Sequence, residues 1–168
     1  MTKQERERKV LEELRKLYSS REWRLNNLYH IVNKYGQDEI LKLNPQQKRV
    51  LIDKIWPLNI ILKARQLGLS TGIDIAGLDA CLFHPNITFG IIDATLPDAK
   101  KKLDKCRYAY NHLPEPLKNK FKLVKDNEQE LEFSNGSVIT ADTSFRGSTV
   151  NMLHISEYAK ICATAVSY

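Results

Sequence analysis

The sequence predicts an α/β fold, with a mainly parallel sheet that is flanked by helices. Three apolar runs, at residues 58–64, 86–94 and 151–155, have the composition of strands that are covered on both faces. Segments with helical signals lie between these runs. Such alternation is typical of parallel sheets, because two parallel strands need a crossover connection, which is usually a helix.

An N-terminal helical arm is expected over residues 1–40. Residues 3–18 carry a narrow apolar stripe on an otherwise charged segment, which predicts an amphipathic helix. Two serines then precede a second helical segment at residues 21–34, and a serine hydroxyl is a common helix N-cap. Residues 41–168 are assigned to the domain that contains the sheet.

Three more helices are expected within this domain. Asn44 and Pro45 start one of them over residues 46–55, since Asn caps a helix well and Pro fits its first turn. The second covers residues 70–82, although its two glycines lower the helix propensity. The third runs over residues 96–112 and begins with a Leu-Pro-Asp sequence.

One β-hairpin is predicted before the last strand. Residues 130–133 and 137–140 have strand character, and Ser134–Gly136 separates them. The Asn-Gly pair in this turn accepts positive φ at both positions, which favours a tight turn.

The composition indicates an ordinary globular protein. The chain has 168 residues, of which 42% are hydrophobic and 27% charged, so it has enough apolar side chains for a core. Its net charge of +6 fits a polyanionic partner such as nucleic acid, although many basic proteins bind none. We find no signal-peptide core and no membrane-length apolar run, so a cytoplasmic location is expected.

The cysteines and histidines show no metal-binding pattern. The three cysteines, Cys81, Cys106 and Cys162, are odd in number and form no C-x-x-C pair. They are expected to be reduced thiols. The four histidines lack ligand spacing, so no zinc site is expected.

A phosphate-binding turn is predicted directly after the first apolar strand. The segment from Lys63 to Thr71 contains a glycine that is soon followed by two hydroxyl residues, and a helical segment comes next. This order is the layout of a P-loop, in which backbone N–H groups bind phosphate oxygens at the start of a helix. The expected nucleotide-binding residues of this turn are Gln66, Leu67, Gly68, Leu69, Ser70 and Thr71.

The usual lysine of the P-loop is missing. Leu69 occupies its position, so Lys63 and Arg65 are the cations that could neutralise a terminal phosphate. Ser70 occupies the place of the hydroxyl that binds Mg²⁺, and Thr71 could substitute for it. The alternative for the two cations is a pair of solvated residues at a strand end.

Glu157 is the expected catalytic acid. It follows the apolar strand at residues 151–155, where a carboxylate could polarise a water for attack on the γ-phosphate and contact Mg²⁺. Ser156 stands before it, where many P-loop enzymes have an aspartate that is associated with Mg²⁺. The alternative is a strand-end glutamate with no special role.

Four other residues are weaker candidates. Gln47 could read adenine through its amide, which offers a donor and an acceptor, although a surface glutamine is an equal alternative. Arg146 could sense the γ-phosphate or hold a loop. Asp93 and Asp98 are assigned structural roles, as a residue after a strand and as a helix cap.

These motifs in this order resemble the N-terminal ATPase domain of the large terminase subunit of tailed phages, the motor that packages DNA into procapsids. That family tolerates a deviant Walker A element, and residues 63–71 look like one of its versions. Residues 23–29 and 44–47 are similar to its lead-in and its adenine-side motif. Residues 145–149 and 153–157 are similar to its Walker B region.

The resemblance implies a P-loop NTPase-type fold that binds ATP and Mg²⁺, with residues 41–168 as a partial ATPase domain. In intact relatives it also implies double-stranded DNA, the small terminase subunit and the portal as partners, in the cytoplasm of a bacterial host cell and without a membrane. Large terminase subunits continue well beyond the Walker B strand, into a coupling motif and a nuclease domain. Here the chain ends eleven residues after Glu157, so we expect an incomplete sheet and a truncated, prophage-type fragment without nuclease activity.

The alternative is a non-catalytic prophage remnant with the same fold, which retains at most weak nucleotide or DNA binding. A helicase-like ATPase of another lineage would share the chemistry, but it would carry helicase motifs that we do not find.

Overall fold

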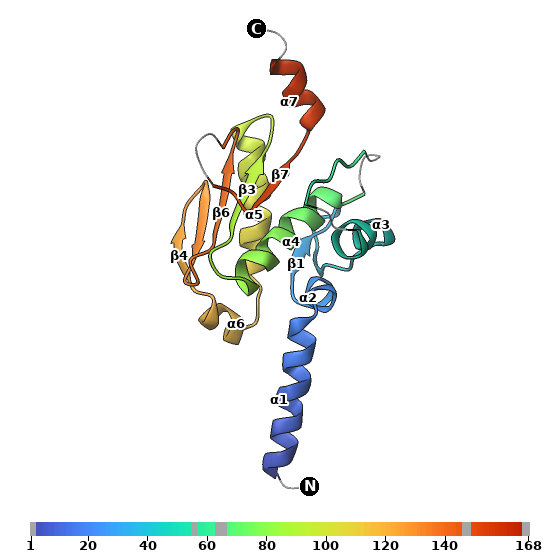
Figure 1. Cartoon of the computed structure of the whole chain (residues 1–168), viewed down its shortest axis with the longest axis vertical. Helices are drawn as coiled ribbons and strands as arrows, with labels where there is room; N and C mark the ends of the chain where they lie inside the picture. The colour runs from blue at the N-terminus through green and yellow to red at the C-terminus, as the bar shows by residue number, and fades with distance from the viewer. Residues whose placement is uncertain (1–2, 55–56, 63–66, 146–148, 166–168) are drawn as a thin grey trace.

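The structure is a computed structural model that describes residues 3–54, 57–62, 67–145 and 149–165 (Figure 1). It is a mixed α/β structure whose main sheet has the strand order β4-β5-β6-β3-β7. The strands are β3 (Thr88–Ile92), β4 (Leu123–Asp126), β5 (Glu130–Phe133), β6 (Val138–Asp142) and β7 (Met152–Ile155). β3 pairs in parallel with β6 and β7, whereas β4-β5 and β5-β6 are antiparallel pairs. The sheet is therefore mixed, and the expectation of a mainly parallel sheet holds only around β3.

Two helices, α4 (Leu69–Phe83) and α5 (Leu96–Asn111), contribute most of the buried helical side chains, and they match the helices predicted over residues 70–82 and 96–112. The side chains of Phe89 and Ile91 on β3 are almost fully buried. A Cβ atom added to Gly77 of α4 would lie only 2.1 Å from the Phe89 ring. Gly77 is therefore required where the helix approaches β3 most closely.

The opposite face of the sheet is partly open near β7. Gly90 of β3 faces Phe145 and Leu153 there, since a Cβ atom at Gly90 would lie within 3.0 Å of both side chains. Leu153 and Ile155 remain 46% and 40% exposed. Leu153 and Ile155 therefore lie on the partly open face, whereas the side chains of His154 and Ser156 are buried.

The strand predicted at residues 58–64 is not formed in its described part, so this prediction is wrong there. Residues 57–62 have no strand pairing, and Leu58, Ile60 and Leu62 are 84%, 89% and 100% exposed. β7 is the outer strand of the described sheet, and no described strand lies beside residues 57–62. A segment of strand composition forms a strand only where a neighbouring strand can pair with its backbone N–H and C=O groups.

The N-terminal region is helical over a shorter stretch than predicted. It forms α1 (Lys3–Ser19) and α2 (Arg21–Asn27), and then the antiparallel strands β1 (His30–Val32) and β2 (Asp38–Ile40). The helix predicted over residues 21–34 is therefore wrong in its second half. Between the two strands the chain reverses, because the Asn33 side chain accepts hydrogen bonds from the backbone N–H groups of Tyr35 and Gln37.

Helix α1 extends away from the rest of the structure, whereas the residues after it enter the core (Figure 1). Arg24 of α2 donates two hydrogen bonds of 2.7 Å to Asp79 of α4, and the Tyr29 hydroxyl donates a third of 2.7 Å. Tyr29 and Leu25 are fully buried in the same hydrophobic core as the sheet residues. A buried ion pair thus joins the N-terminal segment to α4.

A few short helical segments complete the described part of the chain. Asn44 and Gln47 form a reciprocal capping box at α3 (Pro45–Lys48), which continues as a short π-helical segment, η1 (Arg49–Asp53). Together they match the helix predicted from the Asn-Pro signal. The other two helices are α6 (Glu115–Lys120) and α7 (Tyr158–Ala165).

The predicted hairpin is confirmed by β5 and β6, but its turn differs from the expectation. Gly136 has a φ of +81°, whereas Asn135 is not in the left-handed region. The Asn135 side chain instead donates hydrogen bonds to the carbonyl oxygens of Cys81 and Leu82, at 2.8 and 3.2 Å. The turn is therefore anchored to the C-terminal end of α4, and that contact sets its backbone conformation.

Replacing Asp79 with alanine should destabilise the protein strongly. Arg24, which is 6% exposed at its side chain, and the Tyr29 hydroxyl would lose their buried partner. We expect the free energy of unfolding to fall by about 3–5 kcal/mol, as measured by urea denaturation. The control Lys101→Ala, which removes an exposed ion pair with Asp98, should leave the unfolding midpoint unchanged. A loss below about 1 kcal/mol for Asp79→Ala would contradict the buried pair.

Candidate functional site

The start of α4 and the end of β7 lie at the same end of the sheet. His154 on β7 is hydrogen-bonded to Asp74, which lies one helical turn after Ser70 on α4. Ser156 directly follows β7, and its backbone N–H donates to the carbonyl oxygen of Ile92 at 2.9 Å. The start of α4 and the residues after β3 and β7 therefore lie toward the same end of the sheet, the end at which ligands bind in α/β sheets.

The turn before α4 is held in place by the helix that precedes it in the sequence. The Asn44 side chain donates a hydrogen bond to the carbonyl oxygen of Leu67 at 3.0 Å. The Gln47 side chain donates one to the carbonyl oxygen of Gly68 at 2.8 Å. Gly68 has a φ of +66°, and a Cβ atom there would lie 3.0 Å from the Gln47 amide nitrogen. Both the backbone conformation and the close contact favour glycine.

Gln47 has a structural role that the sequence did not indicate. It is 4% exposed, its amide oxygen accepts from the Asn44 N–H at 2.9 Å, and its amide nitrogen donates to Gly68. Both ends of the amide are therefore engaged in holding the turn. A contact between Gln47 and adenine stays a prediction, and it would have to use the second amide N–H.

The first turn of α4 presents hydroxyl groups and one neighbouring cation. Leu69 is buried, so its side chain belongs to the core and not to the turn surface. Ser70 and Thr71 are half-buried, and the Thr71 hydroxyl accepts a hydrogen bond from the Lys105 ammonium of α5 at 3.1 Å. The structure therefore brings Lys105, which sequence reasoning did not single out, to this turn. Lys63, Arg65, Gln66 and Arg146 lie outside the described residues.

Glu157 has an unusual backbone conformation. Its φ of +54° lies in the left-handed region, which is rare for residues other than glycine, asparagine and aspartate. Its side chain is exposed, and its carbonyl oxygen accepts from the N–H groups of Lys160 and Ile161 at the start of α7. Strained backbone of this kind is common at functional sites.

A second acid, Asp93, to which the sequence analysis assigned a structural role, lies at the same end of the sheet. Asp93 follows β3 directly, is 4% exposed and forms an ion pair with Lys102 of α5. Ile92 and Ile155 are partners in the parallel pair, so Asp93 and Ser156 occupy corresponding positions just beyond it. Its burial and its ion pair agree with that structural role.

The described residues show no ready-made metal or thiol site. No group of three or more His, Cys, Asp or Glu side chains among them could hold a metal ion. Burial raises the pKa of the Cys81 thiol to about 12, and it also raises the pKa of Cys106. Neither thiol is poised to act as a nucleophile near neutral pH. A Mg²⁺ site at Ser70 and Glu157 stays a prediction, and Mg²⁺ often keeps several waters and phosphate oxygens as ligands.

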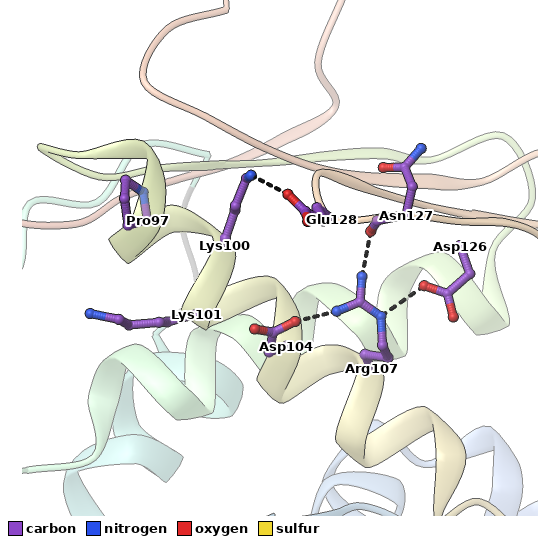
Figure 2. Close-up of a pocket in the computed structure, with 8 residues that line it drawn as sticks. All are labelled: Pro97, Lys100, Lys101, Asp104, Arg107, Asp126, Asn127 and Glu128. Carbon is purple, nitrogen blue, oxygen red and sulfur yellow. Dashed lines mark hydrogen bonds and ion pairs between the residues drawn. The ribbon is translucent and has the colours of Figure 1, made fainter.

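Figure 2 shows a polar pocket between α5 and the β4-β5 turn, and no candidate site residue lines it. Arg107 binds Asp126 at 2.7 Å and also contacts Asp104, and Lys100 binds Glu128 at 2.6 Å. The charges that line the pocket thus neutralise one another. We interpret it as an ion-pair cluster that fixes the turn on α5.

Comparison with protein-family models found no matching family, and comparison with curated proteins found no significantly similar sequence. Among the described helices, none has the length and apolar composition that crossing a membrane requires.

Replacing Gln47 with alanine should loosen the turn before α4. The Gly68 carbonyl and the Asn44 N–H would each lose a buried partner, so we expect a loss of about 1–2 kcal/mol in unfolding free energy. Backbone amides of residues 67–72 should exchange faster in deuterium-exchange experiments. Gln46→Ala, at the exposed neighbouring position, is the matched control. Unchanged exchange at residues 67–72 in Gln47→Ala would show that the turn does not depend on this amide.

The left-handed conformation of Glu157 predicts an unusual order of stability for two substitutions. Glu157→Gly and Glu157→Ala both remove the carboxylate, but only glycine adopts positive φ without strain. We expect the glycine variant to be more stable than the alanine variant by about 1 kcal/mol in urea unfolding, although glycine is normally the less favourable residue. The opposite order would mean that the backbone strain is absent in solution.

Proposed function

We propose that this chain is a P-loop ATPase module of the terminase type, which binds ATP with Mg²⁺ at the turn before α4. The observation that carries the proposal is the placement of the turn at Gly68–Thr71 and of Glu157 at the same end of the sheet. This end provides a helix N-terminus for phosphate groups and a carboxylate for the attacking water.

Each part of the turn has a proposed role. Backbone N–H groups from Gln66 to Thr71 would bind phosphate oxygens, and Lys63 or Arg65 would neutralise the terminal phosphate. The Ser70 hydroxyl would bind Mg²⁺. Leu69 occupies the position of the usual P-loop lysine, and its buried side chain faces the core. This burial supports a phosphate-neutralising cation from another position of the motif.

Glu157 would act as the general base and as a Mg²⁺ contact. Its carboxylate is exposed at the end of β7, and its left-handed backbone sets the direction in which the side chain leaves the chain. Ser156 would hold a metal-bound water. Asp93 lies at the corresponding position after β3, where its buried carboxylate is paired with Lys102, so it has no proposed contact with Mg²⁺.

The wider context of the proposal is viral DNA packaging in the cytoplasm of a bacterial host cell. The partners would be double-stranded DNA, the small terminase subunit and the portal. The net charge of +6 supports a polyanionic partner, because basic side chains supply most of the affinity for phosphate backbones.

Nucleotide binding should be visible as thermal stabilisation. ATP with Mg²⁺ at about a hundred times its dissociation constant should add about 2.7 kcal/mol, which raises the unfolding temperature by about 5–10 °C for a chain of this size. ATP hydrolysis should fall about a hundredfold or more in Glu157→Gln, while the thermal shift is retained. Glu13→Gln, in exposed α1, is the matched control and should change neither value.

The outcomes separate the parts of the proposal. An absence of any thermal shift at millimolar ATP and Mg²⁺ would overturn nucleotide binding. A shift without turnover in the wild-type chain would overturn the hydrolase and would favour a non-catalytic nucleotide-binding protein. Equal turnover in Glu157→Gln and wild type would remove Glu157 from its role.

A further inference from the structure

One buried polar pair joins α4 to β7 directly. His154 Nδ1 and Asp74 Oδ1 are 2.7 Å apart, and their side chains are only 8% and 0% exposed. The two residues are 80 positions apart in the sequence, so the pair is a tertiary contact. The second carboxylate oxygen of Asp74 is buried and has no hydrogen-bond partner.

Packing alone does not require a polar pair at this position. His154 lies opposite Ile91 in the sheet, and Ile91 lies opposite Ala141 of β6, so the other members of this row are buried and apolar. An apolar side chain would fill the position without desolvating a carboxylate. Replacing buried ionic pairs with apolar residues is often neutral or stabilising, so stability by itself does not account for this pair.

The groups that face Asp74 come from α5 as well as from β7. Burial raises the pKa of the Asp74 carboxyl, and His154, Lys105 and Lys102 oppose this effect. The Cys106 thiol also contacts the Asp74 backbone carbonyl at 3.4 Å. Lys105 also donates a hydrogen bond to the Thr71 hydroxyl. The charged groups around Asp74 therefore extend to the first turn of α4.

We propose that Asp74 and His154 are positioning residues of the nucleotide site, which fix the end of β7 relative to the start of α4. The inference rests on the proposed ATPase function. β7 is an outer strand, and among the described strands it pairs only with β3. Because hydrogen bonds restrain it along one edge alone, it keeps some freedom to shift. A directional bond between side chains removes that freedom.

The consequence for the site follows from the alternation of side chains along β7. Ser156 lies two residues after His154 and is buried like it, and Glu157 comes next. A displacement of β7 would therefore move Glu157 relative to Ser70. Misplacement of a catalytic group by about 1 Å costs about a hundredfold in rate, whereas phosphate binding by the turn itself would remain.

The test is the double variant Asp74→Leu with His154→Leu, which replaces the whole pair with apolar side chains. We expect its urea unfolding midpoint to be equal to or above that of the wild type. ATP affinity should change less than about threefold, while the turnover number falls about 10- to 100-fold. The conservative variant Asp74→Asn keeps an oxygen that accepts from His154 Nδ1 and should retain most of the turnover.

A second readout does not depend on ATP. In nucleotide-free protein, the backbone amides of residues 155–158 should exchange with deuterium faster in the double variant than in wild type or in Asp74→Asn. Unchanged exchange there, or turnover within twofold of wild type in a stably folded double variant, would overturn the positioning role. If the wild-type chain neither binds nor hydrolyses ATP, the proposed function fails, and the exchange comparison still decides whether the pair fixes β7.

Discussion

One buried carboxylate of α4, Asp79, holds the N-terminal segment on the core, and a second, Asp74, connects α4 to β7. Asp79 accepts hydrogen bonds from Arg24 and Tyr29 near the N-terminus, and Asp74 binds His154 on β7. Segments from two distant parts of the chain are thereby fixed to one helix. Because a desolvated carboxylate is stable only with good partners, each of these contacts is strongly directional.

The sheet is complete on one side of β3 and open on the other. β4, β5 and β6 close the first side with a hairpin that is anchored to α4 through Asn135. On the other side β7 is the outer strand of the described sheet, its apolar side chains are partly exposed, and residues 57–62 do not form a strand. The candidate site therefore lies at the less restrained edge, where the Asp74–His154 bond and the strained Glu157 backbone have the most effect.

Local signals predicted most of the elements, because those signals act within a few residues. The apolar runs gave β3 and β7, the Asn-Gly turn gave β5 and β6, and the Asn-Pro cap gave α3. Two of the differences from the predicted elements concern strand pairing. Residues 58–62 have strand composition but do not form a strand, and residues 30–32 pair with residues 38–40 instead of continuing a helix. The composition of a segment indicates whether its backbone tends to be extended. Whether the segment joins a sheet depends on the presence of a neighbouring strand.

The sequence by itself determined the residue types at the candidate site. It contains a glycine that can take positive φ before a helix, two hydroxyl residues after it, and an acid after an apolar strand. Only the tertiary structure decided that Gln47 holds the turn, that Lys105 reaches Thr71, and that Asp74 binds His154. These contacts join residues 21 to 80 positions apart, and such distances are set by how helices pack on the sheet rather than by any local pattern.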